Sequence, residues 1–358
     1  MDETEAMERA LSLAWRGWGR VHPNPLVGAV VLRDGVVVGE GWHAEFGGPH
    51  AERRALDQAG AAARGATLVV SLSPCLHQGK QPPCTDAIIA AGIARVVIAL
   101  DDPNPLAAGG GEVLAQAGIA VEYGLTSDQA AAQNAAFLHR HRDDRRPWVA
   151  LKLATSVDGR IADSTGRSQW ISGDAAREWV HWLRAGFDAI AVGAGTVAKD
   201  DPSLTVRGAV TPRAAPLRVV FDDTLTTTPD SRLVNTAGEL PTLIFTSAAR
   251  AASPAAAAIT RAGVTVVSMR SLTDGLQQLR TRGVERLLVE GGARLAGALL
   301  SEGLVDRFYH VQSPVWLGDH ARAAFIGVGD VGLADAPRWR VVERRALGQD
   351  TLIAMDRP

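Results

Sequence analysis

The sequence is poor in cysteine and in aromatic residues, and it has no excess of either charge. Of its 358 residues only two are cysteine and 5% are aromatic, and the formal net charge is −2. Two cysteines in a chain of this size favour a reducing compartment and a metal or catalytic use over a disulfide framework. A near-neutral chain lacks the strongly basic footprint of nucleic-acid and membrane-surface binders. We therefore expect a cytoplasmic protein without a nucleic-acid partner.

Long apolar segments are also missing. No run reaches the roughly 18 apolar residues that would indicate a transmembrane helix. The first ten residues, MDETEAMERA, are acidic and lack the basic and apolar regions of a signal peptide. The hydrophobic content of 46% is nevertheless ordinary for a globular protein, and the length is comfortable for two domains. We expect no membrane partner.

The first half alternates predicted helices and strands. Asp34-Gly35 lies between two short apolar runs, which is the strongest local signal for a hairpin. Apolar spacing and turn residues predict helices at 4–18, 51–63, 84–91, 109–117 and 127–141, and strands at 28–32, 36–41, 67–73, 95–100 and near Ile119. This order predicts a sheet with helices on its faces.

A second α/β pattern follows the charged stretch Arg142–Pro147, RDDRRP, which predicts a linker. We expect helices at 174–185, 253–262, 271–282 and 293–301, and strands at 148–155, 187–192, 217–221, 241–245, 264–267 and 286–289. A helix or turn is expected before Asp200, and a strand-rich tail from 306 to 353. We place two domains at 1–145 and 146–358.

The two cysteines, Cys75 and Cys84, flank one loop, and His50-x-Glu52 begins the helix predicted ahead of it. A His-x-Glu followed by a strand and by Pro-Cys…Cys is the signature of a zinc deaminase. His50, Cys75 and Cys84 would bind zinc and leave one tetrahedral position for water, as a catalytic site requires. Glu52 would then carry protons. The alternatives are three unrelated core residues or a structural zinc with His77 as fourth ligand.

A Gly-Gly turn in the second half is suited to a phosphate. The string VEGG ends at Gly291-Gly292, directly before the helix predicted from residue 293. Glycines let the backbone approach a ligand, and a helix N-terminus offers free N–H groups and a positive dipole end. The pair is equally compatible with a plain strand-to-helix turn. Gly193-x-Gly195 is weaker, because the third glycine and the following acid of a dinucleotide fingerprint are missing.

Residues 1–145 resemble the deaminase domain of a bifunctional riboflavin biosynthesis family. That family joins a diaminohydroxyphosphoribosylaminopyrimidine deaminase to a 5-amino-6-(5-phosphoribosylamino)uracil reductase. The matching segments are HPNPLVGAVV, GWHAEFGGPHAE, SPCLHQGKQPPC and DDPNP. The resemblance implies a three-layer α/β/α fold of the cytidine-deaminase type. It also implies substrate contacts by Asn24, His43, His77 and Lys80. The chain departs from the family at Ser73 and Gln81, where Glu and Thr are usual.

The segment from Arg146 to roughly Ile353 resembles the reductase domain of the same family. The matching strings are LKLATSVDGRIA, SQWISG, GAGTVAKDDPSLTVR and LLVEGGARLAGALL. The resemblance implies a dihydrofolate-reductase-like α/β fold that uses NADPH. The implied cofactor contacts are Ala154, Trp170, Thr196, Asp200 and Asp223, with Gly292, Ala293, Arg294, Leu295, Ala296, Gly297 and Ala298 for the phosphates. The implied substrate contacts are Ser168, Arg184, Leu204, Arg207 and Glu290.

Three functions are compatible with the sequence. The first is a two-step riboflavin enzyme, a homo-oligomer (dimer or tetramer), in which zinc-dependent hydrolytic deamination precedes NADPH-dependent reduction of a ribosyl chain. The second is a nucleic-acid or free-nucleotide deaminase with an accessory domain, although the near-neutral charge counts against nucleic acid. The third is a non-catalytic binding module that zinc stabilises. Glu52 beside an open coordination position counts against this third function.

Overall fold

The computed structural model describes residues 1–143 and 145–358 and divides the chain into two compact units, Met1–Arg142 and Asp143–Pro358. The linker predicted over Arg142–Pro147 includes Asp144, which lies outside the described residues. Within the described ranges, every helix is too short or too polar to cross a lipid bilayer. The two units are described separately below.

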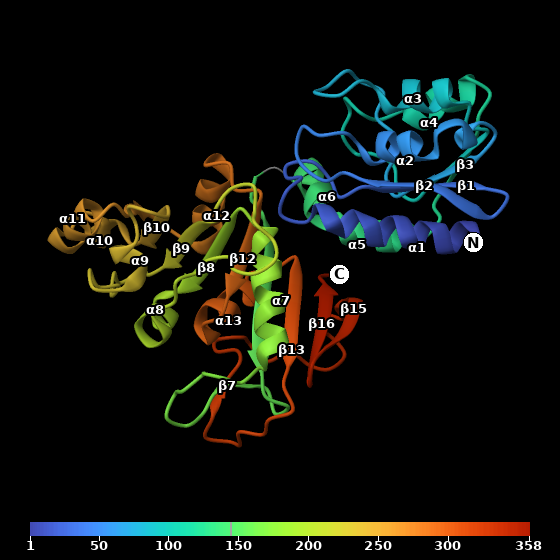
Figure 1. The fold of residues 1–358 in the computed structure, drawn as a ribbon. Coiled ribbons are helices and arrows are strands. Elements are labelled where there is room, and N and C mark those ends of the chain that lie inside the picture. The colour runs from blue at the N-terminus through green and yellow to red at the C-terminus, as the bar shows by residue number, and fades with distance from the viewer. Residues whose placement is uncertain (144) are drawn as a thin grey trace. The chain divides into compact units, whose positions relative to one another are not determined.

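The first unit has the three α/β/α layers that the resemblance implied. Its sheet has the order β2-β1-β3-β4-β5, with β1 antiparallel to its neighbours and β3, β4 and β5 parallel. The strands are β1 (Gly28–Arg33), β2 (Val36–Trp42), β3 (Thr67–Val70), β4 (Arg95–Ile98) and β5 (Ala120–Tyr123). In Figure 1, α2 (Ala51–Ala59), α3 (Cys84–Ala91) and α4 (Gly110–Gln116) cover one face, and α1 (Glu3–Ala14) and α5 (Ser127–Gln133) cover the other.

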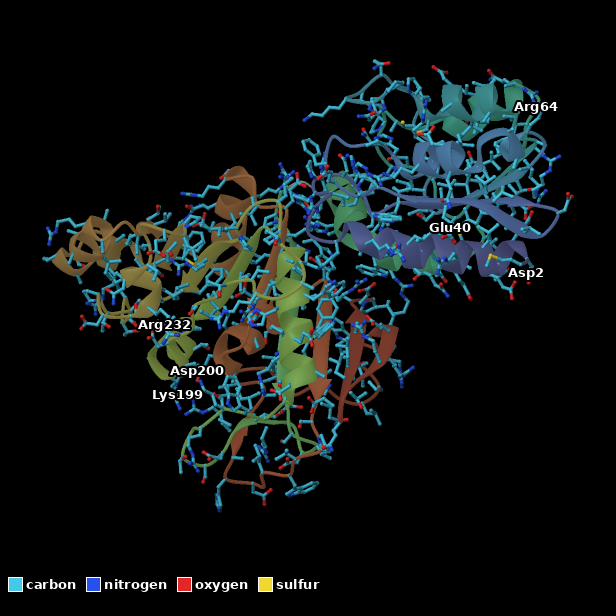
Figure 2. All side chains as sticks on the ribbon, in the orientation of Figure 1. Asp2, Glu40, Arg64, Lys199, Asp200 and Arg232 are labelled. Carbon is cyan, nitrogen blue, oxygen red and sulfur yellow. The ribbon has the colours of Figure 1, made fainter. Side chains whose placement is uncertain are left out.

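Local signals explain most of these elements. Asp2, labelled in Figure 2, is the N-cap of α1 and forms a capping box with Glu5. Short 3-10 turns follow α1 and α2, at Trp15–Gly17 and Gly60–Ala63. The single helix predicted over 127–141 was wrong, because the segment forms α5 and α6 (Ala135–Arg142). Between them, the buried Asn134 side chain accepts a hydrogen bond from the Leu26 N–H and donates one to the Leu26 carbonyl oxygen.

The second unit is built on a nine-stranded mixed sheet of order β11-β10-β9-β8-β12-β6-β13-β16-β15. The first seven strands in this order are parallel, and β16 and β15 are antiparallel to their neighbours. They are β6 (Trp148–Thr155), β8 (Ala189–Gly193), β9 (Leu217–Phe221), β10 (Thr242–Thr246), β11 (Thr265–Ser268), β12 (Arg286–Glu290), β13 (Arg307–Gln312), β15 (Arg340–Leu347) and β16 (Asp350–Asp356). A separate ribbon pairs β7 (Arg160–Ala162) with β14 (Arg322–Ala323).

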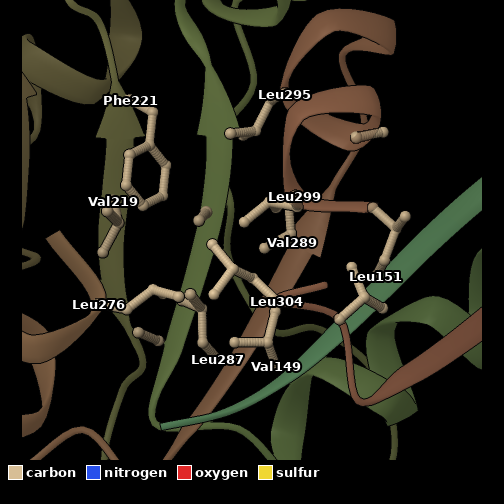
Figure 3. Close-up of a cluster of buried hydrophobic side chains, with 14 of the residues drawn as sticks. Val149, Leu151, Val219, Phe221, Leu276, Leu287, Val289, Leu295, Leu299 and Leu304 are labelled. Carbon is tan, nitrogen blue, oxygen red and sulfur yellow. The ribbon is translucent and has the colours of Figure 1, made fainter. Parts of the chain in front are cut away.

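Helices pack against both faces of the sheet of the second unit. They are α7 (Asp174–Ala185), α8 (Ala194–Asp200), α9 (Arg232–Asn235), α10 (Ala248–Ala251), α11 (Pro254–Arg261), α12 (Leu272–Thr281) and α13 (Ala293–Ser301). One buried cluster joins the sheet to α12 and α13, as Figure 3 shows for Leu276, Leu295 and Leu299. Another joins it to α8, α9 and α11. Because the central strands are parallel, their carboxyl ends meet at one edge, where open α/β sheets bind ligands.

Candidate active sites

The first unit brings its two cysteines and one histidine together. His50 is the N-cap of α2, Cys84 is the first residue of α3, and Cys75 lies in the loop after β3. Their ligand atoms lie within 4.8 Å of one another, with the His50 Nδ1 3.5 Å from the Cys75 Sγ and 3.3 Å from the Cys84 Sγ. His77, the predicted alternative fourth ligand, does not belong to this cluster.

The donor set and its spacing fit zinc. A zinc ion held tetrahedrally by an imidazole nitrogen and a thiolate sulfur separates those two atoms by about 3.6 Å. Contacts with Cys84 and His50 lower the pKa of Cys75 to about 4, which favours the thiolate that binds metal. The hydrogen bond with Cys75, together with burial, raises the pKa of Cys84. The pKa of His50 is raised by its hydrogen bond with Cys75.

Glu52 follows the metal-ligand candidate His50 by two residues and lies in the first turn of α2. Its side chain is buried, with 3% of the residue exposed, and burial raises the pKa of its carboxyl group. A carboxyl group with a raised pKa can both accept and return a proton near neutral pH. Glu52 is therefore suited to acid–base work beside the three ligand atoms.

Two of the predicted substrate contacts form a pair next to the metal cluster. Asn24 Nδ2 lies 3.0 Å from His43 Nε2, and His43 Nδ1 lies 3.3 Å from the Pro49 carbonyl oxygen. Burial lowers the pKa of His43 to about 4, so the ring is neutral at physiological pH. A neutral ring that donates from Nδ1 to Pro49 accepts at Nε2 from Asn24. The His43 and His50 rings pack edge to face at 5.3 Å.

The loop between the cysteines carries the other two predicted substrate contacts, His77 and Lys80. The Lys80 ammonium lies over the Phe46 ring, 4.1 Å from its centroid, and Gln81 donates a hydrogen bond to the Gly47 carbonyl oxygen at 2.8 Å. These contacts tie the loop to the segment ahead of α2. Ser73, the other departure from the family, is buried.

The second unit has a cavity of about 1200 Å³ at the carboxyl ends of its central strands. Nearly all the predicted cofactor and substrate contacts line it: Ala154, Ser168, Trp170, Arg184, Thr196, Asp200, Leu204, Arg207, Asp223, Glu290, Gly292, Ala293, Arg294, Leu295 and Ala298. Figure 2 labels Asp200 beside Lys199 at the end of α8. Ala296 and Gly297 do not line the cavity. Ala296 is fully buried, and a Cβ at Gly297 would collide with the Ile326 carbonyl oxygen.

The start of α13 has the geometry of a phosphate seat. Gly291 and Gly292 have φ of 78° and 87°, which favours glycine at both positions. A Cβ at Gly292 would lie 3.4 Å from the Thr196 hydroxyl oxygen, so a side chain there would narrow the cavity. The glycine pair thus leaves the first N–H groups of α13 open to a ligand, and the residues present fit the phosphates of a nucleotide cofactor.

Arg184 and Arg207, both implied as substrate contacts, lie in different environments. Arg184 donates two hydrogen bonds to Glu290, at 2.6 and 2.7 Å, and one to the Thr205 carbonyl oxygen at 2.8 Å. Among the described residues, three of its five N–H donors thus have a partner and two do not. Arg207 is exposed, and in the part of the chain that the structure describes it donates one hydrogen bond, to the Thr205 hydroxyl oxygen. Arg207 therefore has more N–H donors available to bind an anion than Arg184 has.

Lys152 lines the cavity and is not among the residues predicted from the sequence. It is paired in register with Glu290 on the neighbouring strand β12, and burial lowers the pKa of its ammonium group. The available signal was a lysine in the otherwise apolar strand LKLA. His181 and Arg232 also line the cavity and had no recognisable local pattern.

Comparisons with known proteins cover both units. Residues 1–100 match the cytidine and deoxycytidylate deaminase zinc-binding region, and residues 147–353 match the RibD C-terminal domain. The chain is 42% identical to the riboflavin biosynthesis protein RibD of Escherichia coli over 99% of both chains. It is 40% identical to RibD of Aquifex aeolicus, over 98% of this chain and 97% of the relative.

Solved structures agree with the sequence relatives. The fold is similar to Acinetobacter baumannii RibD with a TM-score of 0.81, at 37% identity and over 99% of both chains. It is similar to a diaminohydroxyphosphoribosylaminopyrimidine deaminase/5-amino-6-(5-phosphoribosylamino)uracil reductase from Thermotoga maritima with a TM-score of 0.82, at 36% identity and over 99% of both chains. Each of these relatives therefore contains counterparts of both units, in the same order along its chain.

Proposed function

Because the chain belongs to the RibD family of riboflavin biosynthesis proteins, we propose that residues 1–145 carry its deaminase site and residues 146–358 its reductase site. The chain is a bifunctional enzyme, a hydrolase and an oxidoreductase. The first reaction replaces an amino group of diaminohydroxyphosphoribosylaminopyrimidine by oxygen and releases ammonia. The second reduces the ribosyl chain of 5-amino-6-(5-phosphoribosylamino)uracil to ribityl. The observation that carries the assignment is the full-length match combined with the His50–Cys75–Cys84 cluster beside Glu52.

In the deaminase site, His50, Cys75 and Cys84 would hold a zinc ion. When bound there, zinc would lower the pKa of a water ligand to about 7 and so supply a nucleophile at neutral pH. The Glu52 carboxylate takes a proton from the attacking water, whose oxygen replaces the amino group, and delivers that proton to the nitrogen of the departing amine, which leaves as ammonia. Asn24 and His43 orient the pyrimidine ring beside these groups, because their mutual hydrogen bond fixes the imidazole. His77 and Lys80 extend the site along the loop, with Lys80 at the substrate phosphate.

In the reductase site, the backbone at the start of α13, from Gly292 to Leu295, would hold the phosphates of NADPH, with Ala298 lining the cavity beside it and Ala296 and Gly297 packed away from it. NADPH supplies the hydride for the ribosyl chain when it is bound. Ala154, Trp170, Thr196, Asp200 and Asp223 complete its contacts. The protein positions the substrate through its phosphate, which Arg207 and the two uncommitted donors of Arg184 bind. Ser168, Leu204 and Glu290 line the substrate end.

The assignment is tested by supplying each substrate separately. We expect Glu52→Gln to lower deamination about a hundred- to ten-thousand-fold, the usual contribution of a positioned acid–base group. The same variant should reduce 5-amino-6-(5-phosphoribosylamino)uracil with NADPH at the wild-type rate. Asp57→Asn, on the exposed side of the same helix, is the matched control and should leave both rates unchanged.

Two outcomes would contradict the assignment. Near wild-type deamination by Glu52→Gln would mean that Glu52 is only a helix N-terminal residue stabilised by the helix dipole. A wild-type chain that converts neither substrate would overturn the function itself.

The assembly and the compartment are part of the same proposal. A homo-oligomer, dimer or tetramer, is supported by the family resemblance, and light scattering on the purified chain measures it. A cytoplasmic location is supported by the two free cysteines, because zinc ligation requires reduced thiols.

A further inference from the structure

One end of the reductase cavity carries an aspartate, Asp223, whose carboxylate has no bonding partner among the described residues. Asp222 and Asp223 both follow β9 and both line the cavity. The Asp222 carboxylate is buried and accepts hydrogen bonds from the backbone and hydroxyl groups of Thr226 and Thr227. The Asp223 carboxylate is exposed, and within residues 1–143 and 145–358 no hydrogen bond or ion pair to it is found. Asp223 therefore presents a free negative charge to the cavity.

The backbone holds Asp223 in place. Its carbonyl oxygen accepts hydrogen bonds from the Ser247 N–H at 3.2 Å and from the Thr246 hydroxyl at 3.1 Å. Both partners lie at the end of the neighbouring strand β10. The position of the residue is thus determined by the sheet, while its side chain remains available to a ligand.

The order of the strands decides which part of a dinucleotide would reach Asp223. The phosphate seat follows β12, and the substrate groups Arg184, Glu290 and Lys152 lie on the β12 and β6 side of the cavity. The nicotinamide must lie on that side to deliver a hydride. The adenosine half must then extend in the opposite direction, across β8 toward the ends of β9 and β11, where Asp223 and Met269 line the cavity. Asp223 is the free carboxylate at the adenosine end.

A free carboxylate beside an adenosine ribose has a specific effect. In dinucleotide sites an acidic residue accepts hydrogen bonds from the ribose 2′-hydroxyl, whereas a nearby arginine accommodates a 2′-phosphate. A 2′-phosphate next to Asp223 would bring like charges together, and a carboxylate has no proton to donate to a phosphate oxygen. We infer that Asp223 determines the cofactor preference of the reductase: it binds the ribose hydroxyls and limits the advantage of NADPH over NADH, so that NADH is also a hydride donor. This inference rests on the proposed reductase function.

The test compares Asp223→Asn with the wild-type chain, using both cofactors. The variant should raise the ratio of kcat/KM for NADPH to that for NADH by about fivefold or more, the factor for one like-charge contact exposed to water. Dissociation constants for NADP⁺ and NAD⁺, measured by calorimetry without substrate, should shift by the same ratio. Asp230→Asn removes the same charge from the same loop outside the cavity and should shift neither ratio.

The outcomes separate the inference from the function on which it rests. Unchanged ratios in Asp223→Asn, with normal turnover, would overturn the role of Asp223 and leave the reductase assignment intact. A wild-type chain that turns over with NADPH and not at all with NADH would also overturn the inference. Failure to reduce the substrate with either cofactor would overturn the reductase assignment and the inference together.

Discussion

Replacing Arg184 by methionine tests whether the reductase site depends on a buried ion pair for its stability. The side chains of Arg184 and Glu290 are 14% and 13% exposed, and these two residues, 106 positions apart in the sequence, join α7 to β12. Arg184→Met leaves the Glu290 carboxylate buried without its partner, which typically costs about 3–5 kcal/mol. Lys152 also attracts Glu290, so we expect the lower end of that range. About 3 kcal/mol corresponds to a fall in Tm of roughly 6–12 °C for a domain of this size.

The assay is differential scanning calorimetry of the full chain. The transition of the second unit is the one that rises in temperature when NADPH is added, since a ligand stabilises the folded state that binds it. Arg232→Met is the control, because its ion pair with Asp201 is about half exposed and such pairs contribute about 0–1 kcal/mol. Adding Glu290→Gln to Arg184→Met removes the stranded charge and should recover part of the loss. A Tm of Arg184→Met within about 2 °C of wild type would refute the reasoning.

The Arg184–Glu290 pair also predicts that the stability of the second unit depends on pH. Although burial opposes it, the Arg184 guanidinium lowers the pKa of Glu290 in the folded chain. A depressed folded-state pKa stabilises the chain above the unfolded value, about 4.3 for glutamate, and this stabilisation is lost as pH falls through the folded value. In Arg184→Met the carboxyl group keeps its burial and loses the guanidinium, so its pKa lies above the unfolded value and the variant regains stability as pH falls through that raised pKa. The difference in Tm between wild type and Arg184→Met should therefore be largest near neutral pH and shrink continuously as the solution is acidified to below about pH 4.

Two further predictions concern the zinc and the substrate phosphate. Metal analysis should find one zinc per chain in the wild type and in His77→Gln, and none in a Cys75→Ser/Cys84→Ser variant, because His77 lies outside the ligand cluster. Full zinc content in the double variant would contradict the ligand assignment. Arg207→Ala should raise the KM for the reductase substrate about ten- to a hundred-fold, since a charge-assisted contact contributes about 1.5–3 kcal/mol. Its Tm and its affinity for NADPH should not change, and a weakened cofactor with an unchanged substrate KM would place this arginine at the cofactor phosphate instead.

The sequence alone determined the elements and motifs that depend on neighbouring residues. The helices at 84–91, 174–185 and 293–301 and the strand at 148–155 have the predicted bounds, because periodicity and end signals act over a few residues. The metal cluster was also predictable, since its ligands lie at the ends of such local elements. α9 and α10, of four residues each, are too short to show a period and were not predicted.

Only the tertiary structure decided the features that depend on residues distant in the chain. Asn134 breaks a helix because Leu26, 108 residues away, offers both of its backbone groups. Two of the Arg184 donors are engaged because Glu290 lies beside it, whereas Arg207, implied as a substrate contact by the same resemblance, is exposed. Lys152 joins the cavity through its register with β12. Local patterns encode conformation, but partners and burial arise only when the sheet brings separate strands together, and these contacts determine which charges remain free to act.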